Sequence, residues 1–154
     1  MTDEVSIIDS MEEALLVCTA LTFTPVTDAR VRWLDQDGDY DLAHEFWRAG
    51  GFSLKRDEWD EIHNEGYRYS GLVEDQVLAS RAAVWTYSSM RWELAAVSTR
   101  DGNWARGYAT AVCSFVTAHI LASGRTATCH TRSGNGPMQR VVLSLGYCPS
   151  TEAN

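Results

Sequence analysis

The segment from Asn103 to Thr110 has the residue types of an anion-binding loop. It joins a predicted strand to a long apolar helix, whose first backbone N–H groups have no partner within the helix and lie at the positive end of its dipole. Gly107 lets a phosphate approach the backbone, Ala109 keeps the first turn narrow, and Arg106 adds a positive charge. The spacing predicts an anion-binding site at the start of the helix. A glycine needed only for the geometry of the turn is the alternative.

A carboxylate on the preceding predicted strand is a candidate base. Glu93 lies six residues before Thr99 and shares one face of the strand with Val97 and Thr99, because strand side chains alternate. From there it can take the proton of an attacking amine. The alternative is that Glu93 only pairs across the sheet with Arg81 or Arg91.

The next predicted strand carries a second group that can transfer protons. An imidazole exchanges protons near neutral pH, so His130 is a candidate base or acid, although a lone histidine on a strand is more often structural. Cys129 beside it would need a separate base to act as a nucleophile, and the sequence places none. We expect no covalent role for Cys129.

The elements that position these groups alternate between strands and helices. The C-terminal part predicts an antiparallel meander, then a helix, a strand and a last helix, over residues 67–72, 77–87, 91–99, 107–123, 126–131 and up to Gly146. The N-terminal part predicts a helix, a strand and two helices, over residues 10–23, 29–34, from Asp39 or Asp41 to Gly50, and 54–64. At 154 residues the chain has the size of one domain, of mixed α/β class.

The sequence WELAAVSTRDGNWARGYATAV resembles the acetyl-CoA motif of the GNAT N-acetyltransferase superfamily, a strand followed by (Q/R)xxGx(G/A) and a helix. The pattern falls on Trp104, Gly107 and Ala109. Further on, Asn135 precedes a helix that closes with Gly146 and an aromatic residue, which is similar to the second motif of the family. Two motifs in this order and spacing identify the chain as a member of that superfamily.

The resemblance implies the fold and its division. We expect a single GNAT-like domain over residues 1–154, with a central, mixed, mostly antiparallel sheet flanked by helices. Residues 1–64 would form the acceptor side, and residues 67–147 would form the acetyl-CoA-binding core. The activity implied is transfer of an acetyl group from acetyl-CoA to a primary amine, without a metal ion.

The resemblance also implies which residues bind acetyl-CoA. In the family the strand of the motif splays from its neighbour, so the backbone around Val97, Ser98 and Thr99 would bond the pantetheine arm. Asn135 would contact this arm or shape its pocket. Backbone N–H groups of the loop and the first helical turn would hold the pyrophosphate, from Trp104, Ala105, Arg106, Gly107, Tyr108, Ala109 and Thr110.

Three positions depart from the pattern of the family. Trp104 replaces the usual Gln or Arg, and Val142 stands where many members carry a tyrosine thought to protonate the leaving thiolate. After the last helix, residues 147–154 suffice for one short strand where the family has two. Since an open sheet edge is usually covered or paired, we expect the N-terminal helix or a homodimer to close it.

The composition limits the kinds of molecule that the protein is expected to bind. The net charge of −8 and the pI of 4.9 repel nucleic acid and anionic lipid, so we expect neither, and a cationic small-molecule or peptide amine is the plausible acceptor. No run reaches the ~18 apolar residues of a membrane helix. Acidic residues precede the apolar run 14–23, and the four cysteines form no CxxC pair, so we expect a cytoplasmic protein.

Two hypotheses for the function therefore compete. The first is an enzyme that acetylates a primary amine by direct transfer. The second is a degenerate GNAT domain that binds CoA or a partner protein without turnover, favoured by Val142 and the short C-terminal segment.

Two other groups of residues have a possible function. The acidic segment 35–41 has part of the spacing of a calcium loop, but Tyr40 replaces its glycine and Phe46 its bidentate glutamate, so we expect a solvated turn. Aromatic side chains are candidates for an acceptor pocket, although most should belong to the core. They are Trp33, Trp47, Trp59, Tyr67, Tyr69, Trp85 and Tyr87.

Overall fold

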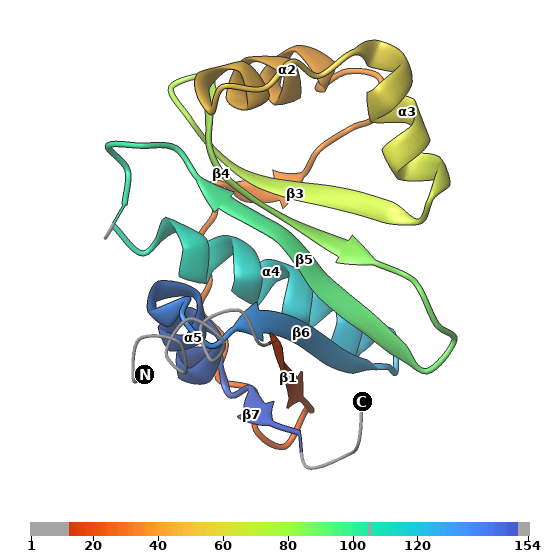
Figure 1. Ribbon diagram of the computed structural model, residues 1–154, viewed down its shortest axis with the longest axis vertical. Helices are drawn as coiled ribbons and strands as arrows, with labels where there is room; N and C mark the ends of the chain where they lie inside the picture. Colours follow the sequence, from red (N-terminus) through yellow and green to blue (C-terminus); the bar gives the residue numbers. More distant parts are fainter. Residues whose placement is uncertain (1–12, 105, 151–154) are drawn as a thin grey trace, which may run out of the picture.

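The computed structural model describes residues 13–104 and 106–150 (Figure 1). Within them lie one seven-stranded sheet and four helices, which confirms the mixed α/β class. The strands are β1 (Glu13–Cys18), β2 (Val31–Trp33), β3 (Tyr67–Glu74), β4 (Val77–Trp85), β5 (Arg91–Thr99), β6 (Thr126–Arg132) and β7 (Cys148–Pro149). The helices are α2 (Tyr40–Ala49), α3 (Arg56–Asn64), α4 (Tyr108–Ala122) and α5 (Gly136–Leu145).

The sheet is mostly antiparallel, as the resemblance implies. Its strand order is β2-β3-β4-β5-β6-β1-β7, and only β5 and β6, which α4 connects, run parallel. The meander β3-β4-β5 predicted from the sequence is confirmed. Its first turn has positive φ at both Asp75 (52°) and Gln76 (64°), the conformation that matches the twist of paired strands.

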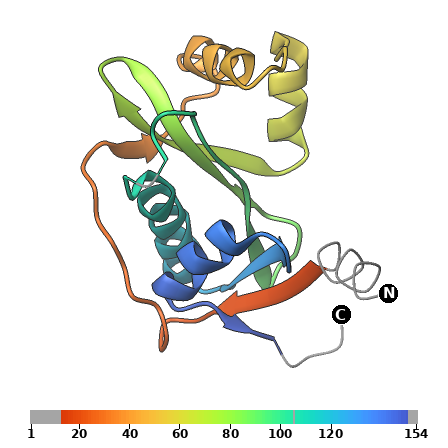
Figure 2. The same ribbon diagram turned by 60° about the vertical axis from the view of Figure 1, so that its left-hand side comes forward.

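Helices cover both faces of the sheet (Figures 1 and 2). Along β4, Ala82 and Val84 belong to the core under α4 and α5, while Ala83 between them belongs to the core under α2 and α3. Because successive strand residues point to opposite faces, the two cores lie on opposite sides of the sheet. Each core contains residues from both the N-terminal and the C-terminal part of the chain, so the division expected from the sequence stays a prediction.

Helix α4 is buried on most of its surface, as its apolar composition predicts. It begins after Gly107 and ends before Gly124, and both glycines have the positive φ that favours glycine. Its buried positions include Val112, Val116 and Ile120, which have no exposed area. Among residues 13–104 and 106–150, no helix has both the length and the hydrophobicity needed to cross a membrane.

The predicted helix over residues 10–23 is wrong where the structure describes it. Residues 13–18 form β1, which pairs along its whole length with β6 and buries Leu16 and Cys18, while residues 10–12 lie outside the described part. The apolar run fits both a helix and a strand. A short isolated helix is marginal, whereas the edge of β6 supplies a complete ladder of backbone hydrogen bonds.

β1 changes which strands form this edge of the sheet. It lies between β6 and β7, and β7 consists of only two residues, which pair with Leu16 and Val17. The edge of β6 is thus covered by a strand of the same chain. The short strand after α5 agrees with the sequence, and residues 151–154 lie outside the described part. β7 pairs with only two of the six residues of β1, and the homodimer stays a prediction.

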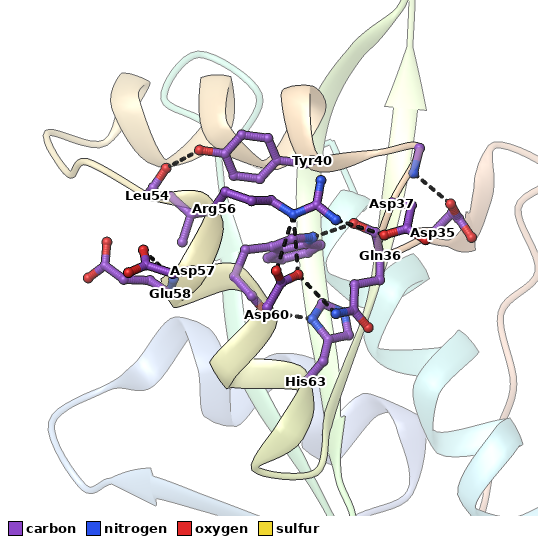
Figure 3. A network of polar contacts seen from close by, with 12 residues as sticks. Asp35, Gln36, Asp37, Tyr40, Leu54, Arg56, Asp57, Glu58, Asp60 and His63 are labelled. Atoms are coloured by element: carbon purple, nitrogen blue, oxygen red, sulfur yellow. Dashed lines mark hydrogen bonds and ion pairs between the residues drawn. The ribbon is translucent and has the colours of Figure 1, made fainter.

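The acidic segment 35–41 forms a turn held by ion pairs with arginines. Asp39 binds Arg32 at 2.7 Å. Arg56 at the start of α3 binds Asp37 at 2.7 Å, as Figure 3 shows. No three His, Cys, Asp or Glu side chains within the described ranges are grouped to hold a metal ion. The segment therefore attaches α3 to the end of β2.

Candidate active site

The site begins where β5 and β6 separate. The parallel pairing between the two strands covers three residue pairs and ends with Glu93 opposite Thr128. Beyond this point β6 continues to pair with β1 on its other side. A cavity of about 990 Å³ lies along the rest of β5, between that strand, the start of α4, β6 and α5. Its volume lies at the upper end of the ~300–1,000 Å³ typical of small-molecule sites.

A bulge in β5 shapes the wall of this cavity. Arg81 of β4 is opposite Ser98, and Ala83 is opposite Ala95, so β5 has one residue more than β4 between these pairs. The φ of Ala96 in the bulge is 54°, a left-handed value that costs a non-glycine residue about 1–2 kcal/mol. A bulge bends its strand and changes the direction of the backbone groups. Here it does so beside the cavity, where β6 no longer pairs with β5.

The start of α4 presents free backbone donors to the same cavity. Gly107, Tyr108, Ala109 and Thr110 all line it. No side chain caps this end of α4, and its first turn has no acidic residue. The φ of Gly107 is 80°, and no atom lies within 4 Å of the place where a β-carbon would be. Glycine is therefore required by the backbone conformation, and the space beside it stays open.

The side chain of Tyr108 points away from these donors. Its hydroxyl donates to the Glu74 carboxylate at 2.9 Å, and Arg30 binds the same carboxylate at 2.6 Å. The ring is buried in the core under α4. The Tyr108 side chain thus anchors the first turn of α4 to Glu74 and the core, while the residues of this turn also line the cavity.

Glu93 and His130 meet at the point where the strands diverge. Glu93 Oε2 accepts hydrogen bonds from the His130 backbone N–H at 2.9 Å and from His130 Nδ1 at 2.8 Å. Its Oε1 accepts from the Thr128 hydroxyl at 2.6 Å. The Glu93 side chain is 9% exposed and that of His130 is 43% exposed. A buried carboxylate therefore holds a more exposed imidazole at the edge of the cavity.

The contact with Glu93 decides which nitrogen of His130 is available. A carboxylate accepts hydrogen bonds, so Nδ1 donates its proton to Glu93 and Nε2 is the nitrogen left to accept one. Tyr87 extends the network, since its hydroxyl lies 3.2 Å from that of Thr128. The Glu93 carboxylate therefore binds Thr128 and His130. The alternative considered from the sequence was pairing across the sheet with Arg81 or Arg91.

Helix α5 forms the opposite wall of the cavity. Asn135 begins it as a helix cap, with its side-chain oxygen accepting from the Met138 N–H at 3.2 Å. Met138, Val141 and Ser144 face the cavity. Val142, at the position of the expected tyrosine, is fully buried in the core. A side chain at this position of α5 therefore packs inside the fold.

Cys129 lines the cavity without being a reactive thiol. Burial, with a smaller contribution from the nearby Glu93, raises the pKa of the Cys129 thiol to about 12. The thiolate is the nucleophilic form of cysteine, and it is scarce at neutral pH for such a group. This agrees with the absence of a covalent role expected from the sequence.

Most of the residues proposed from the sequence lie around one cavity. Ala105 lies outside the described residues, and Arg106 is exposed and does not line the cavity. The residues brought together are Glu93, Val97, Ser98, Thr99, Trp104, Gly107, Tyr108, Ala109, Thr110, His130 and Asn135.

Sequence reasoning missed the bulge at Ala96, the wall made by α5 and the direct contact between Glu93 and His130. The strand–helix–strand order places β5 beside β6 and so indicates that the two groups are near each other. It does not give the register of the strands, which determines the contact.

A second cavity of about 680 Å³ lies on the α2 side of β5. It shares Ser98, Thr99 and Trp104 with the first cavity. Of the aromatic residues considered for an acceptor pocket, Trp47 lines it, and the others do not. Its remaining lining residues are Phe46, Ala49, Gly50, Phe52, Arg81, Arg100 and Asp101.

Comparison with known structures supports the fold assignment. An acetyltransferase of the GNAT family from Colwellia psychrerythraea matches with a TM-score of 0.70 and 14% identity, over 97% of this chain and 59% of its own. The ribosomal-protein-S18-alanine N-acetyltransferase of Escherichia coli matches with a TM-score of 0.64 and 16% identity, over 79% of this chain and 78% of its own. The chain spans only 53% to 64% of the first four matched structures.

Comparison of sequences identifies the family. No curated protein matches the chain. A family model described as FR47-like protein matches residues 69–153, which is more than half of the 154 residues. The matched segment contains both walls of the first cavity, from β5 to α5. The chain therefore has the GNAT fold and belongs to the FR47-like family.

Proposed function

We propose that the protein transfers an acetyl group from acetyl-CoA directly to a primary amine. One observation carries this proposal: a single cavity connects the uncapped start of α4 with the Glu93–His130 pair, along the side of β5 that β6 leaves. The first end suits a pyrophosphate, and the second end suits removal of a proton from an amine. Amide formation from a thioester needs both.

The residues around the cavity fit acetyl-CoA. The first-turn N–H groups of Tyr108, Ala109 and Thr110 would bind the pyrophosphate at the positive end of the dipole of α4. Backbone groups of Val97 and Ser98 would bond the pantetheine arm, as a further strand does at the edge of a sheet. Met138 and Val141 of α5 provide an apolar surface on the other side of the arm.

His130 would act as the base in this reaction. Acetyl-CoA supplies a thioester: the acceptor nitrogen bonds to its acyl carbon, the carbon–sulfur bond breaks, and water protonates the departing thiolate. His130 Nε2 takes the proton that the nitrogen loses, and Glu93 stabilises the imidazolium through Nδ1. Glu93 thereby positions His130, in place of acting as the base by itself.

Release of free thiol tests this proposal. Purified protein is incubated with acetyl-CoA and a panel of small primary amines and peptides, and thiol is measured against samples without amine. The proposal predicts release that depends on an amine and is lost in His130→Gln. If acetyl-CoA binds but no amine increases thiol release, the protein is a CoA-binding module without turnover. The buried Val142 is the observation that favours this second function.

A further inference from the structure

Arg81 is a partly buried cation without an anionic partner among the described residues. Its Nε is buried and has no hydrogen-bond partner, and no described residue forms an ion pair or hydrogen bond with its guanidinium. Instead the guanidinium carbon lies 3.9 Å from the ring centre of Trp47, 5.3 Å from that of Phe46 and 5.6 Å from that of Tyr69. Three aromatic rings thus surround a positive charge that nothing in the described chain neutralises.

Such an arrangement has a cost for a folded protein. Cation–π contacts contribute roughly 0.5–2 kcal/mol each, whereas a buried donor without a partner, such as Arg81 Nε, costs about 1–3 kcal/mol. Burial lowers the pKa of Arg81, with an opposite effect from Tyr69, but an arginine stays protonated at neutral pH. A methionine would fill the same space without this cost. The gain and the cost are of similar size, so the arginine adds little to the stability of the fold and is available to bind an anion.

The second cavity is where the guanidinium can find an anion. Arg81 lines it, and its Nε is buried without a hydrogen-bond partner. Arg100 lines the same cavity and is already bonded to Glu45 at 3.0 Å and to the Leu78 carbonyl at 3.3 Å. Asp101 is the acidic residue in the lining. One paired and one unpaired arginine therefore face a space bounded by aromatic rings.

We propose that Arg81 binds a carboxylate of the acceptor, so that the substrate is an amine that also carries an acid, such as an amino acid. This inference rests on the proposed acetyl transfer. Arg81 is opposite Ser98 on β5, and Ser98 and Thr99 separate the two cavities. An acceptor held by its carboxylate at Arg81 lies on the α2 face, next to the β5 segment proposed to hold the thioester arm.

The first experiment compares acceptors that differ only in charge. Thiol release from acetyl-CoA is measured with the proteinogenic α-amino acids and with their α-carboxamides. Arg81→Met removes the cation and keeps an unbranched apolar side chain. Arg68→Met is the matched control, because Arg68 also stacks on a tryptophan, 4.1 Å from the ring centre of Trp33, and lines neither cavity.

The inference predicts a preference for the acid that depends on Arg81. For at least one amino acid, kcat/KM exceeds that of its carboxamide by about tenfold or more, as expected for a charge-assisted hydrogen bond. The preference disappears in Arg81→Met and persists in Arg68→Met. Equal use of acids and carboxamides, or a preference that survives in Arg81→Met, would overturn the inference while leaving acetyl transfer intact.

Binding measurements separate this inference from the proposed function. The inference predicts that calorimetry detects binding to the wild type and to Arg68→Met but not to Arg81→Met. The ligand is the preferred amino acid, or each amino acid of the set if none is acetylated. Binding without turnover supports the Arg81 site and rejects the transferase. Absence of binding by every amino acid rejects the site.

Two further outcomes follow from the same variants. Weaker acetyl-CoA binding by Arg81→Met would mean that the anion is a phosphate of the cosubstrate, and would overturn the inference. The unfolding midpoint in urea should be unchanged or higher in Arg81→Met, because an apolar group replaces a buried Nε–H that has no partner. A large decrease would instead indicate that Arg81 holds the fold together.

Discussion

The two cavities beside β5 are built in different ways. The first lies between the uncapped start of α4 and the part of β5 that no longer pairs with β6, with Glu93 and His130 at one end. The second presents side chains from α2, β4 and the end of β5, among them Trp47 and Arg81. Backbone recognition suits a cosubstrate shared by many proteins, while side chains can differ from one protein to the next. Under the proposed function, the second cavity would therefore select the acceptor.

Replacing His130 should have the largest effect on turnover and little on either binding site. His130→Gln removes the base, and general base catalysis typically contributes about 10²–10⁴-fold, so kcat should fall by that amount. Stabilisation by acetyl-CoA should be kept. His44→Gln is the control, since His44 lies on α2 and lines neither cavity. Steady-state kinetics in which His130→Gln stays within about threefold of the wild type would exclude the base role.

Glu93→Gln should have a smaller effect of the same kind. The amide keeps the size of the side chain but no longer stabilises a positive imidazole, so we expect kcat to fall by about 10–100-fold. Because the two residues act as a unit, the double variant Glu93→Gln/His130→Gln should be no slower than His130→Gln alone. A double variant much slower than either single one would show that Glu93 acts independently of His130.

Replacing Trp104, which lines both cavities, should have the smallest effect on function of the variants considered. Its side chain is 66% exposed, lines both cavities and donates from Nε1 to the Thr99 carbonyl at 2.9 Å. Trp104→Ala should therefore weaken acetyl-CoA binding and raise the KM of the acceptor, each by a few fold, about 1 kcal/mol. Arg81→Met should affect only the acceptor. Titration of both ligands against both variants tests whether the cavities are separable, and a loss confined to one ligand in Trp104→Ala would contradict the shared wall.

The sequence predicts the parts of the fold that depend on local patterns. The meander, α4 and α5 follow from strand alternation, turn residues and helical spacing within short segments. The segment around Leu16 does not, because its apolar residues fit a helix or a strand equally well. What decides between them is the edge of β6, more than a hundred residues away in the sequence. The predicted helix over residues 10–23 was wrong because pairing with a distant strand outweighs the local preference of the segment.

The same reasoning explains which parts of the candidate site were found. Gly107 and the residues after it form a continuous motif, so their common location is readable from the order of residues. The contact between Glu93 and His130 depends on the register of two parallel strands. The cage around Arg81 combines α2, β3 and β4. Three-dimensional packing produces both, and neither has a local signature.

Stabilisation by acetyl-CoA tests the central claim most directly. At about 100 times its dissociation constant, a ligand adds about 2.7 kcal/mol of stability. For a domain of this size, that corresponds to a rise in Tm of roughly 5–10 °C.

The decisive variants are two glycines at opposite ends of α4, Gly107 and Gly124, with φ of 80° and 81° and open space beside each. Both changes to Glu cost similar backbone strain, but only Gly107→Glu places a negative charge in the first cavity. We predict the full rise in Tm for the wild type and Gly124→Glu and none for Gly107→Glu. No rise in the wild type, or the same rise in Gly107→Glu, would contradict the account.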